Sequence, residues 1–322
     1  MQYVGIHTLR AQNNFRSVLL LCMFPCLVLL LTLLFSALLV FFTSEGGLHV
    51  NIWEESLYMV KSISPFILGG VVIWFLIAYF ANTSIIRSAT GSHPLERKGN
   101  KRVYNLVENL CMSHGMPMPQ INVIEDDSLN AFASGIDKRT YTVSLSRGII
   151  NRLDDEELEA VVAHELTHIR NNDVRLLIVS IVFVGIFAMI SQIAFNILRY
   201  TPSSRNRNDK NGGGIVAIIL IALVVAGIGY FFASLMRFAI SRNREYMADA
   251  GSAEMTRKPH ALASALRKIA FDPDIEAVKR DDVAQLFIEH PNKKKKQLFS
   301  GIAGLFATHP PIEKRISILE QI

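Results

Sequence analysis

Cysteine is scarce in this sequence, and charged residues are absent from long parts of it. Three cysteines occur among 322 residues: Cys22 and Cys26 lie inside an apolar run, and Cys111 stands alone. These thiols are too few for a disulfide framework or a four-cysteine zinc site. We exclude both and expect a reducing compartment.

The stretches without any charged side chain are residues 17–44, 62–86, 176–198 and 211–236. Each is longer than the roughly 20 residues that cross about 30 Å of hydrocarbon. Hydrophobic residues make up 50% of the chain, which is too apolar for an ordinary soluble protein of this size. We therefore predict four transmembrane helices. The first exceeds a signal-peptide core in length, so we expect it to be retained as an anchor.

Basic residues near the predicted spans indicate an orientation. Arg10 and Arg16 precede the first span, Lys61 is the single basic residue in the next loop, and a basic cluster begins at Arg87. The positive-inside rule then places the N-terminus and residues 87–175 in the cytoplasm. Four basic residues disagree, because this topology sends them outside: Arg199, Arg205, Arg207 and Lys210. The first hairpin usually determines the topology of the whole chain, so we keep this orientation.

The apolar runs divide the chain into four segments. These are an N-terminal transmembrane hairpin (1–86), the first part of a water-soluble domain (87–175), a transmembrane hairpin inserted in that domain (176–236), and the second part of the domain (237–322).

The first soluble part has signals for both strands and helices. Alternating β-branched residues predict strands at 121–125 and 140–145, with an edge strand between them at 130–135. Asp154 followed by Glu157 is typical of a capping box that opens a helix.

The helix that begins at Asp154 contains His164, Glu165 and His168. Positions four apart share one helix face, so both imidazoles can reach one Zn²⁺ at about 2.0–2.1 Å. Glu165 lies beside these ligands and can take a proton from a water whose pKa zinc lowers. The pattern predicts metal-assisted peptide hydrolysis.

A catalytic zinc site has three protein ligands and one open position. Glu245 is our predicted third ligand, because it follows the fourth apolar run about as closely as His168 precedes the third. A membrane hairpin would return the chain to the same side and depth. Asp249, one helical turn later, can accept a hydrogen bond from a ligating imidazole. Asp173 remains an alternative third ligand.

Four motifs in this order resemble the HtpX family of bacterial membrane metalloproteases, relatives of the CAAX prenyl endopeptidases: "NAFASG", "AVVAHELTHIRNNDV", "SRNREYMADAGS" and "THPPIEKRI". The resemblance implies an α+β integral membrane protein with four transmembrane helices and a mainly helical, zincin-like catalytic domain containing a small β-sheet. It implies one zinc per subunit, a multi-pass protein of the bacterial inner membrane with a cytoplasmic catalytic domain, and cleavage of misfolded or damaged membrane proteins under stress.

The resemblance also implies roles for individual residues. It makes His164, His168 and Glu245 the zinc ligands and Glu165 the catalytic base. It suggests that Asn130 touches the substrate backbone and that His309 stabilises the tetrahedral oxyanion. The residues alone favour other roles, a turn cap for Asn130 and a loop histidine before two prolines for His309.

Two other functions compete with the protease. A non-enzymatic membrane scaffold with a decayed metal site is disfavoured by the intact Glu165. A nucleic-acid binder is disfavoured because Lys293–Lys296 is one basic run without aromatic interleaving. That run suits anionic lipid headgroups, or it is simply a solvated charge run. We expect the lipid bilayer as a partner and no nucleic acid.

Overall fold

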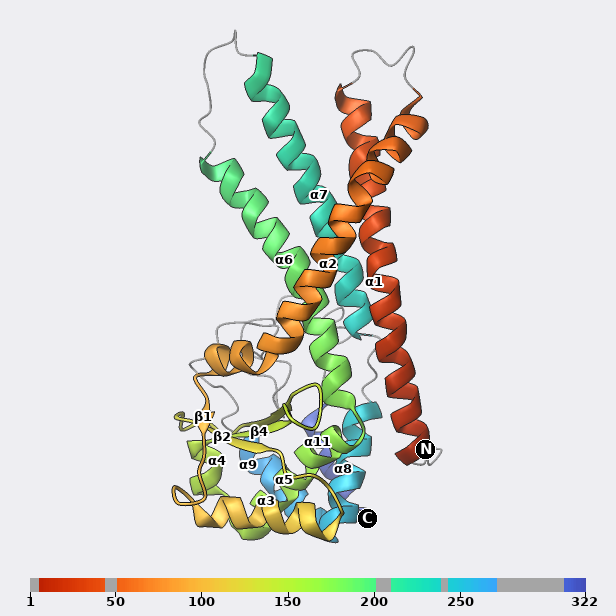
Figure 1. Cartoon of the computed structure of the whole chain (residues 1–322). Coiled ribbons are helices and arrows are strands. Elements are labelled where there is room, and N and C mark those ends of the chain that lie inside the picture. The colour runs from red at the N-terminus through yellow and green to blue at the C-terminus, as the bar shows by residue number, and fades with distance from the viewer. Residues whose placement is uncertain (1–5, 44–50, 201–209, 239–242, 271–309) are drawn as a thin grey trace. The chain divides into compact units, whose positions relative to one another are not determined.

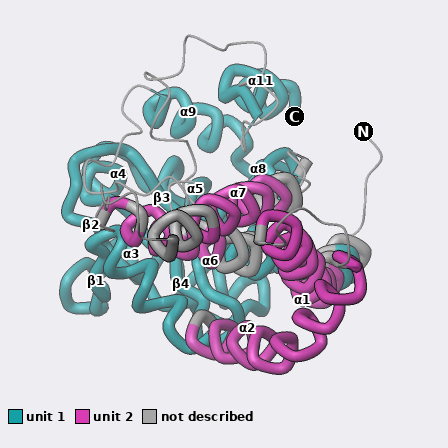
Figure 2. The backbone as a smooth tube through the Cα atoms, turned by 90° about the horizontal axis from the view of Figure 1, so that it is seen from above, with its two compact units in different colours: residues 1–17, 79–178, 238–322 teal, residues 18–78, 179–237 magenta. Residues whose placement is uncertain are grey.

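The computed structural model describes residues 6–43, 51–200, 210–238, 243–270 and 310–322 (Figure 1). The chain divides into two compact units, each built from separated segments (Figure 2). Unit 1 comprises residues 1–17, 79–178 and 238–322, and unit 2 comprises residues 18–78 and 179–237. The four-segment division expected from the sequence stays a prediction.

Unit 2 consists of parts of four helices: α1 (Ile6–Thr43), α2 (Ile52–Thr90), α6 (Asp173–Tyr200) and α7 (Lys210–Phe238). Their buried apolar side chains form one cluster, made of Phe24, Leu31, Val71, Phe187, Ile221 and Val225. Gly229 permits the close packing, because a Cβ atom there would lie 2.4 Å from a ring carbon of Phe187.

Two helices are long and apolar enough to cross a membrane, over Leu21–Phe42 and Ile52–Ile77. Large hydrophobic side chains on these helices are exposed, among them Phe66 and Phe80 at 80% and 77%. Water would penalise such an apolar surface, whereas lipid would not. In the described part of the chain, α6 and α7 contain only shorter apolar stretches, Gly185–Ile197 and Ile218–Phe232. The third and fourth spans therefore stay predictions.

Unit 1 contains a mixed four-stranded sheet with the order β1-β2-β4-β3. The strands are β1 (His93–Pro94), β2 (Gln120–Ile124), β3 (Ala131–Ser134) and β4 (Thr142–Ser146). β2 runs parallel to β4, whereas β3 pairs with β4 antiparallel, with Ala133 opposite Val143. The three strands predicted from the sequence are present, and β3 lies at an edge of the sheet as expected.

The helices of unit 1 surround α5 (Asp155–Arg170), whose residues from Ala160 to Thr167 are all buried. α5 packs against β3, α8 (Asn243–Thr256) and α9 (Pro259–Ile269), and α11 (Ile312–Leu319) packs against α8 and α9. Before α5 come α3 (Lys101–Ser113) and the short α4 (Arg147–Arg152).

The N-terminus of α5 has the capping box that the sequence predicts. Asp154 accepts a hydrogen bond from the Glu157 N–H at 2.9 Å, and Glu157 accepts one from the Asp154 N–H at 3.1 Å. Glu157 also accepts bonds from Ser264 at 2.7 Å and Lys268 at 2.6 Å, both on α9. A charged group is buried here at low cost because it has a full set of partners.

The end of α5 is a sharp turn into α6. Asn172 adopts a φ of 60°, a left-handed conformation that asparagine tolerates better than most residues. Its side chain accepts a hydrogen bond from Tyr141 at 3.3 Å and donates one to Asn14 at 3.1 Å. The turn is therefore fixed by polar contacts on both sides, and it ends at Asp173, the first residue of α6.

Candidate metal centre

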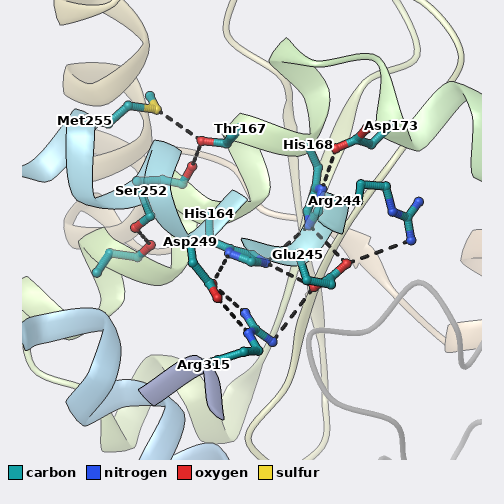
Figure 3. A network of polar contacts seen from close by, with 12 residues as sticks. His164, Thr167, His168, Asp173, Arg244, Glu245, Asp249, Ser252, Met255 and Arg315 are labelled. Carbon is teal, nitrogen blue, oxygen red and sulfur yellow. Dashed lines mark hydrogen bonds and ion pairs between the residues drawn. The ribbon is translucent and has the colours of Figure 1, made fainter. Parts of the chain in front are cut away.

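Three potential ligands converge between α5 and α8. The Nε2 atoms of His164 and His168 lie 3.2 Å apart, and each lies 3.7 Å from an oxygen of Glu245. Figure 3 shows the three side chains pointing toward one another. His164 and Glu245 are almost fully buried, with side-chain exposures of 1% and 2%. Side chains separated by 77 positions in the sequence thus meet at one point.

The spacing of these atoms fits a metal ion. In a tetrahedral zinc site with bonds of about 2.0–2.1 Å, neighbouring ligand atoms lie roughly 3.3 Å apart. The two histidine nitrogens match that edge length, and each of them is nearest to a different Glu245 oxygen, Oε2 for His164 and Oε1 for His168. One ligand atom from each residue lies within 4.8 Å of the other two, so a small closing movement would bring three donors around one ion. The fourth corner is left for a water or a substrate atom. Two imidazoles and one carboxylate are also a donor set that zinc accepts.

Each histidine is oriented by a second carboxylate. Asp249 lies 3.0 Å from Nδ1 of His164, and Asp173 lies 3.0 Å from Nδ1 of His168. An ionised carboxylate only accepts hydrogen bonds, so it holds the imidazole proton on Nδ1. The two Nε2 atoms then lie 3.2 Å apart, where both can bind the same cation.

Arg315 holds Asp249 in place from α11. Its Nε and Nη2 atoms donate to the two Asp249 oxygens at 2.9 and 2.7 Å, and the arginine is completely buried. Burial raises the pKa of Asp249, but the Arg315 charge and the His164 hydrogen bond outweigh burial and lower the pKa overall. Asp249 is therefore ionised, as a group that orients His164 must be.

The pKa of His164 also reflects these neighbours. Burial by itself lowers this pKa, but the contacts with Asp249 and Glu245 outweigh burial and raise the pKa to about 9. The two carboxylates that favour a proton on His164 would likewise favour a metal cation beside it.

Glu165 lies next to His164 and is not one of the three converging groups. Burial raises its pKa; the charges of His164 and His168 oppose this, and the Glu245 carboxylate adds to it. Proximity to the backbone of Ala133, in the edge strand β3, also opposes the rise. Glu165 therefore lies on the face of α5 that packs against β3.

The close approach of α5 and α8 positions these groups. A Cβ atom on Gly251 would lie 2.4 Å from the Cγ2 atom of Thr167, so only glycine fits there. Ser252 donates a hydrogen bond to the Ala160 carbonyl at 2.6 Å, between the same two helices. These contacts lie on α8 C-terminal to Glu245 and Asp249 and hold both residues against α5.

The structure brings together five of the predicted residues, namely His164, Glu165, His168, Glu245 and Asp249. Asp173, the alternative third ligand, contacts the far nitrogen of His168. Asn130 is fully buried, and its side-chain oxygen accepts the Ala131 N–H at 2.9 Å.

Part of the prediction lies outside the described residues, including His309 and Lys293–Lys296. Our sequence reasoning missed the contact of Asp173 with His168 and the role of Arg315. For Arg315 the only sequence signal was its place in the "THPPIEKRI" motif.

Comparisons with known proteins agree on one family. The model of "Peptidase family M48" matches residues 97–322. A "Protease HtpX homolog" of Bacteroides fragilis is 66% identical over 322 residues, covering 100% of both chains. Another, from Lactobacillus helveticus, is 38% identical over 79% of this chain and 85% of its own length.

Among solved structures, the crystal structure of S. mikatae Ste24p matches 90% of this chain and 62% of its own, with 19% identity and a TM-score of 0.46. From the family model and the full-length relatives, we conclude that the chain belongs to peptidase family M48 and is a membrane metalloprotease of the HtpX type.

Proposed function

We propose that this metalloprotease is a zinc endopeptidase of the bacterial inner membrane that cleaves misfolded or damaged membrane proteins on the cytoplasmic side. The observation that carries the proposal is the convergence of two imidazole nitrogens and one carboxylate within 4.8 Å of one another, with Glu165 beside them. Such a set leaves one coordination position open, as catalytic zinc sites require.

His164, His168 and Glu245 would hold the zinc. When bound, the metal supplies Lewis acidity, which polarises a peptide carbonyl and lowers the pKa of a water molecule. Asp249 and Asp173 keep the Nδ1 protons in place, so that both Nε2 atoms remain available as ligands.

Glu165 would act as the general base. Its carboxylate accepts a proton from the attacking water and then delivers that proton to the leaving amine. A pKa raised by burial suits both steps, because a very acidic carboxyl group would accept the proton poorly. The helix that carries Glu165, α5, packs against β3.

The substrate would bind as an extended strand along β3. Among the described strands β3 pairs with β4 alone, so an extended peptide would add to the sheet along the other edge of β3. Asn130 precedes this strand; its side-chain oxygen accepts the Ala131 N–H, so its NH2 group would be the donor to the peptide backbone. His309 would stabilise the oxygen on which negative charge develops.

The membrane location follows from the chain's connectivity. Asp173 begins a helix that continues into an apolar run, and Glu245 follows another such run closely. A site so connected would meet polypeptide at the bilayer surface, which suits damaged membrane proteins as substrates. The basic residues beginning at Arg87 support a cytoplasmic orientation.

Removing the metal tests the proposal directly. A chelator is expected to abolish casein cleavage by the detergent-solubilised chain, and stoichiometric Zn²⁺ is expected to restore it. Glu245→Ala is expected to lose bound zinc because only two ligands remain. Zinc content is measured by atomic absorption and cleavage by release of labelled peptides. Full zinc and activity in Glu245→Ala would show that another residue completes the site.

Asp173→Ala is expected to lower zinc affinity about 10–100-fold, because His168 loses the group that fixes its orientation. Asp173→Asn keeps an oxygen acceptor, so its zinc affinity is expected to fall less than that of Asp173→Ala. Both affinities are obtained by competition with a chelator of known strength. Equal affinities in all three chains would mean that the Asp173 contact does not orient the ligand.

A further inference from the structure

Arg244 is a buried cation beside the candidate metal site with no hydrogen-bond partner among the described residues. It immediately precedes Glu245 on α8, and its side chain is only 11% exposed. Among the described residues it forms one ion pair, in which Nη2 lies 3.8 Å from Oε1 of Glu245, beyond hydrogen-bond distance. The Nε atom is fully shielded and finds no acceptor in that part of the chain.

Arg315 provides a direct contrast within the same site. It approaches the other oxygen of Glu245 at the same distance, 3.8 Å, but it donates two short bonds to Asp249. Figure 3 shows the two arginines on different sides of Glu245. The Arg315 guanidinium is therefore hydrogen-bonded within the protein, whereas Arg244 makes no hydrogen bond to the described residues.

Exposure indicates from which side a ligand reaches the site. Arg315 and His164 have side-chain exposures of 0% and 1%, so the site is closed on their side. His168 and Arg244 retain 12% and 11%. Arg244 contacts the Glu245 oxygen that faces His168, so both partly open groups border the same part of the site.

Holding an unsatisfied guanidinium here is costly. A buried donor without an acceptor loses its hydration without compensation. A positive charge near Glu245 also opposes a divalent ion at the same carboxylate, so metal binding does not explain why an arginine lies at this position. A ligand that supplies an oxygen acceptor would explain it, because a guanidinium presents five N–H donors in a fixed plane.

We propose that Arg244 binds the peptide substrate by donating its free N–H groups to a backbone carbonyl oxygen of the chain being cleaved. A backbone oxygen is the acceptor present in every substrate of an endopeptidase, whatever its side chains. The inference rests on the proposed function and deepens it by naming a substrate-binding residue. It assigns no metal-binding role to Arg244.

Binding to an inactive enzyme tests the inference separately from catalysis. In a full-length Glu165→Gln background, the Kd of a fluorescein-labelled unfolded casein peptide is measured by anisotropy. Adding Arg244→Gln is expected to raise the Kd about tenfold, the effect of losing a charge-assisted hydrogen bond. Arg244→Lys is expected to give a Kd between that of the chain with Arg244 intact and that of Arg244→Gln, because lysine keeps the charge but lacks the planar guanidinium. Zinc content is expected to stay unchanged.

Arg170→Gln is the matched control. Arg170 is equally buried, at 11%, but it donates a hydrogen bond to Glu254 at 3.3 Å. Its replacement is expected to leave the peptide Kd within about twofold.

The measurement is repeated with a peptide whose Asp and Glu residues are replaced by Asn and Gln, and Arg244→Gln is expected to weaken both peptides equally. An unchanged Kd overturns the inference, as does an effect confined to the acidic peptide, which would indicate a carboxylate ligand. Zinc loss in Arg244→Gln also overturns it, by making Arg244 a support for Glu245. If the wild-type chain binds zinc but neither binds nor cleaves the peptide, the proposed function itself fails.

Discussion

Glu165→Gln is expected to retain zinc and to lower the rate of casein cleavage by about 10³-fold or more. Glutamine has nearly the same shape as glutamate but cannot take a proton from water at neutral pH. The three converging ligands do not include Glu165, so their geometry is preserved. Cleavage rate and zinc content are measured on the same detergent-solubilised preparation.

Glu159→Gln serves as the control for this experiment. Glu159 lies on the same helix, but its side chain is 33% exposed and contacts Lys258 at 3.6 Å. This variant is expected to cleave casein at the wild-type rate. If Glu165→Gln lost its zinc together with its activity, the residue would be structural. Full activity in Glu165→Gln would remove the general-base mechanism.

Arg315→Met is expected to destabilise the chain by about 3–5 kcal/mol. Asp249 is 3% exposed and would lose both guanidinium bonds, leaving a carboxylate buried without a compensating charge. The orientation of His164 depends on Asp249, so weaker zinc binding is expected as well. The free energy of unfolding is obtained from denaturant titration of the metal-free chain in detergent, which separates the stability loss from the metal effect.

The double variant Arg315→Met, Asp249→Leu separates the two causes of this loss. Removing both charges is expected to recover much of the stability, because no uncompensated charge remains buried. Zinc affinity is expected to stay low, because His164 has lost its hydrogen-bond acceptor. A single Arg315→Met variant that lost less than about 1 kcal/mol would show that water or another group compensates Asp249.

Several elements were predictable because they depend on residues close together in the chain. The capping box of Asp154 and Glu157 marks the start of α5 at the observed position. His164 and His168 share a face because of helical geometry alone. The alternating residues of β2 and β4 indicate strands, since a two-residue period suits no other regular structure. The long apolar runs can likewise be recognised from composition and length alone.

Glu245 was predictable for a different reason. An apolar hairpin that leaves a membrane surface must return to it, so residues flanking the two runs were expected to meet. The structure brings Glu245 to both histidines. What the sequence did not indicate is how α8 approaches α5 closely enough, which depends on Gly251 fitting against Thr167.

The sequence by itself determined the local parts of this protein: two histidines on one helix face, the glutamate between them, the strands and the apolar runs. Only the tertiary structure decided how these parts are held. The left-handed turn at Asn172 places Asp173 against His168, and the packing of α11 places Arg315 against Asp249. The physical reason is that helix and strand periodicity follow from neighbouring residues, whereas these contacts join segments whose approach depends on packing of the whole unit.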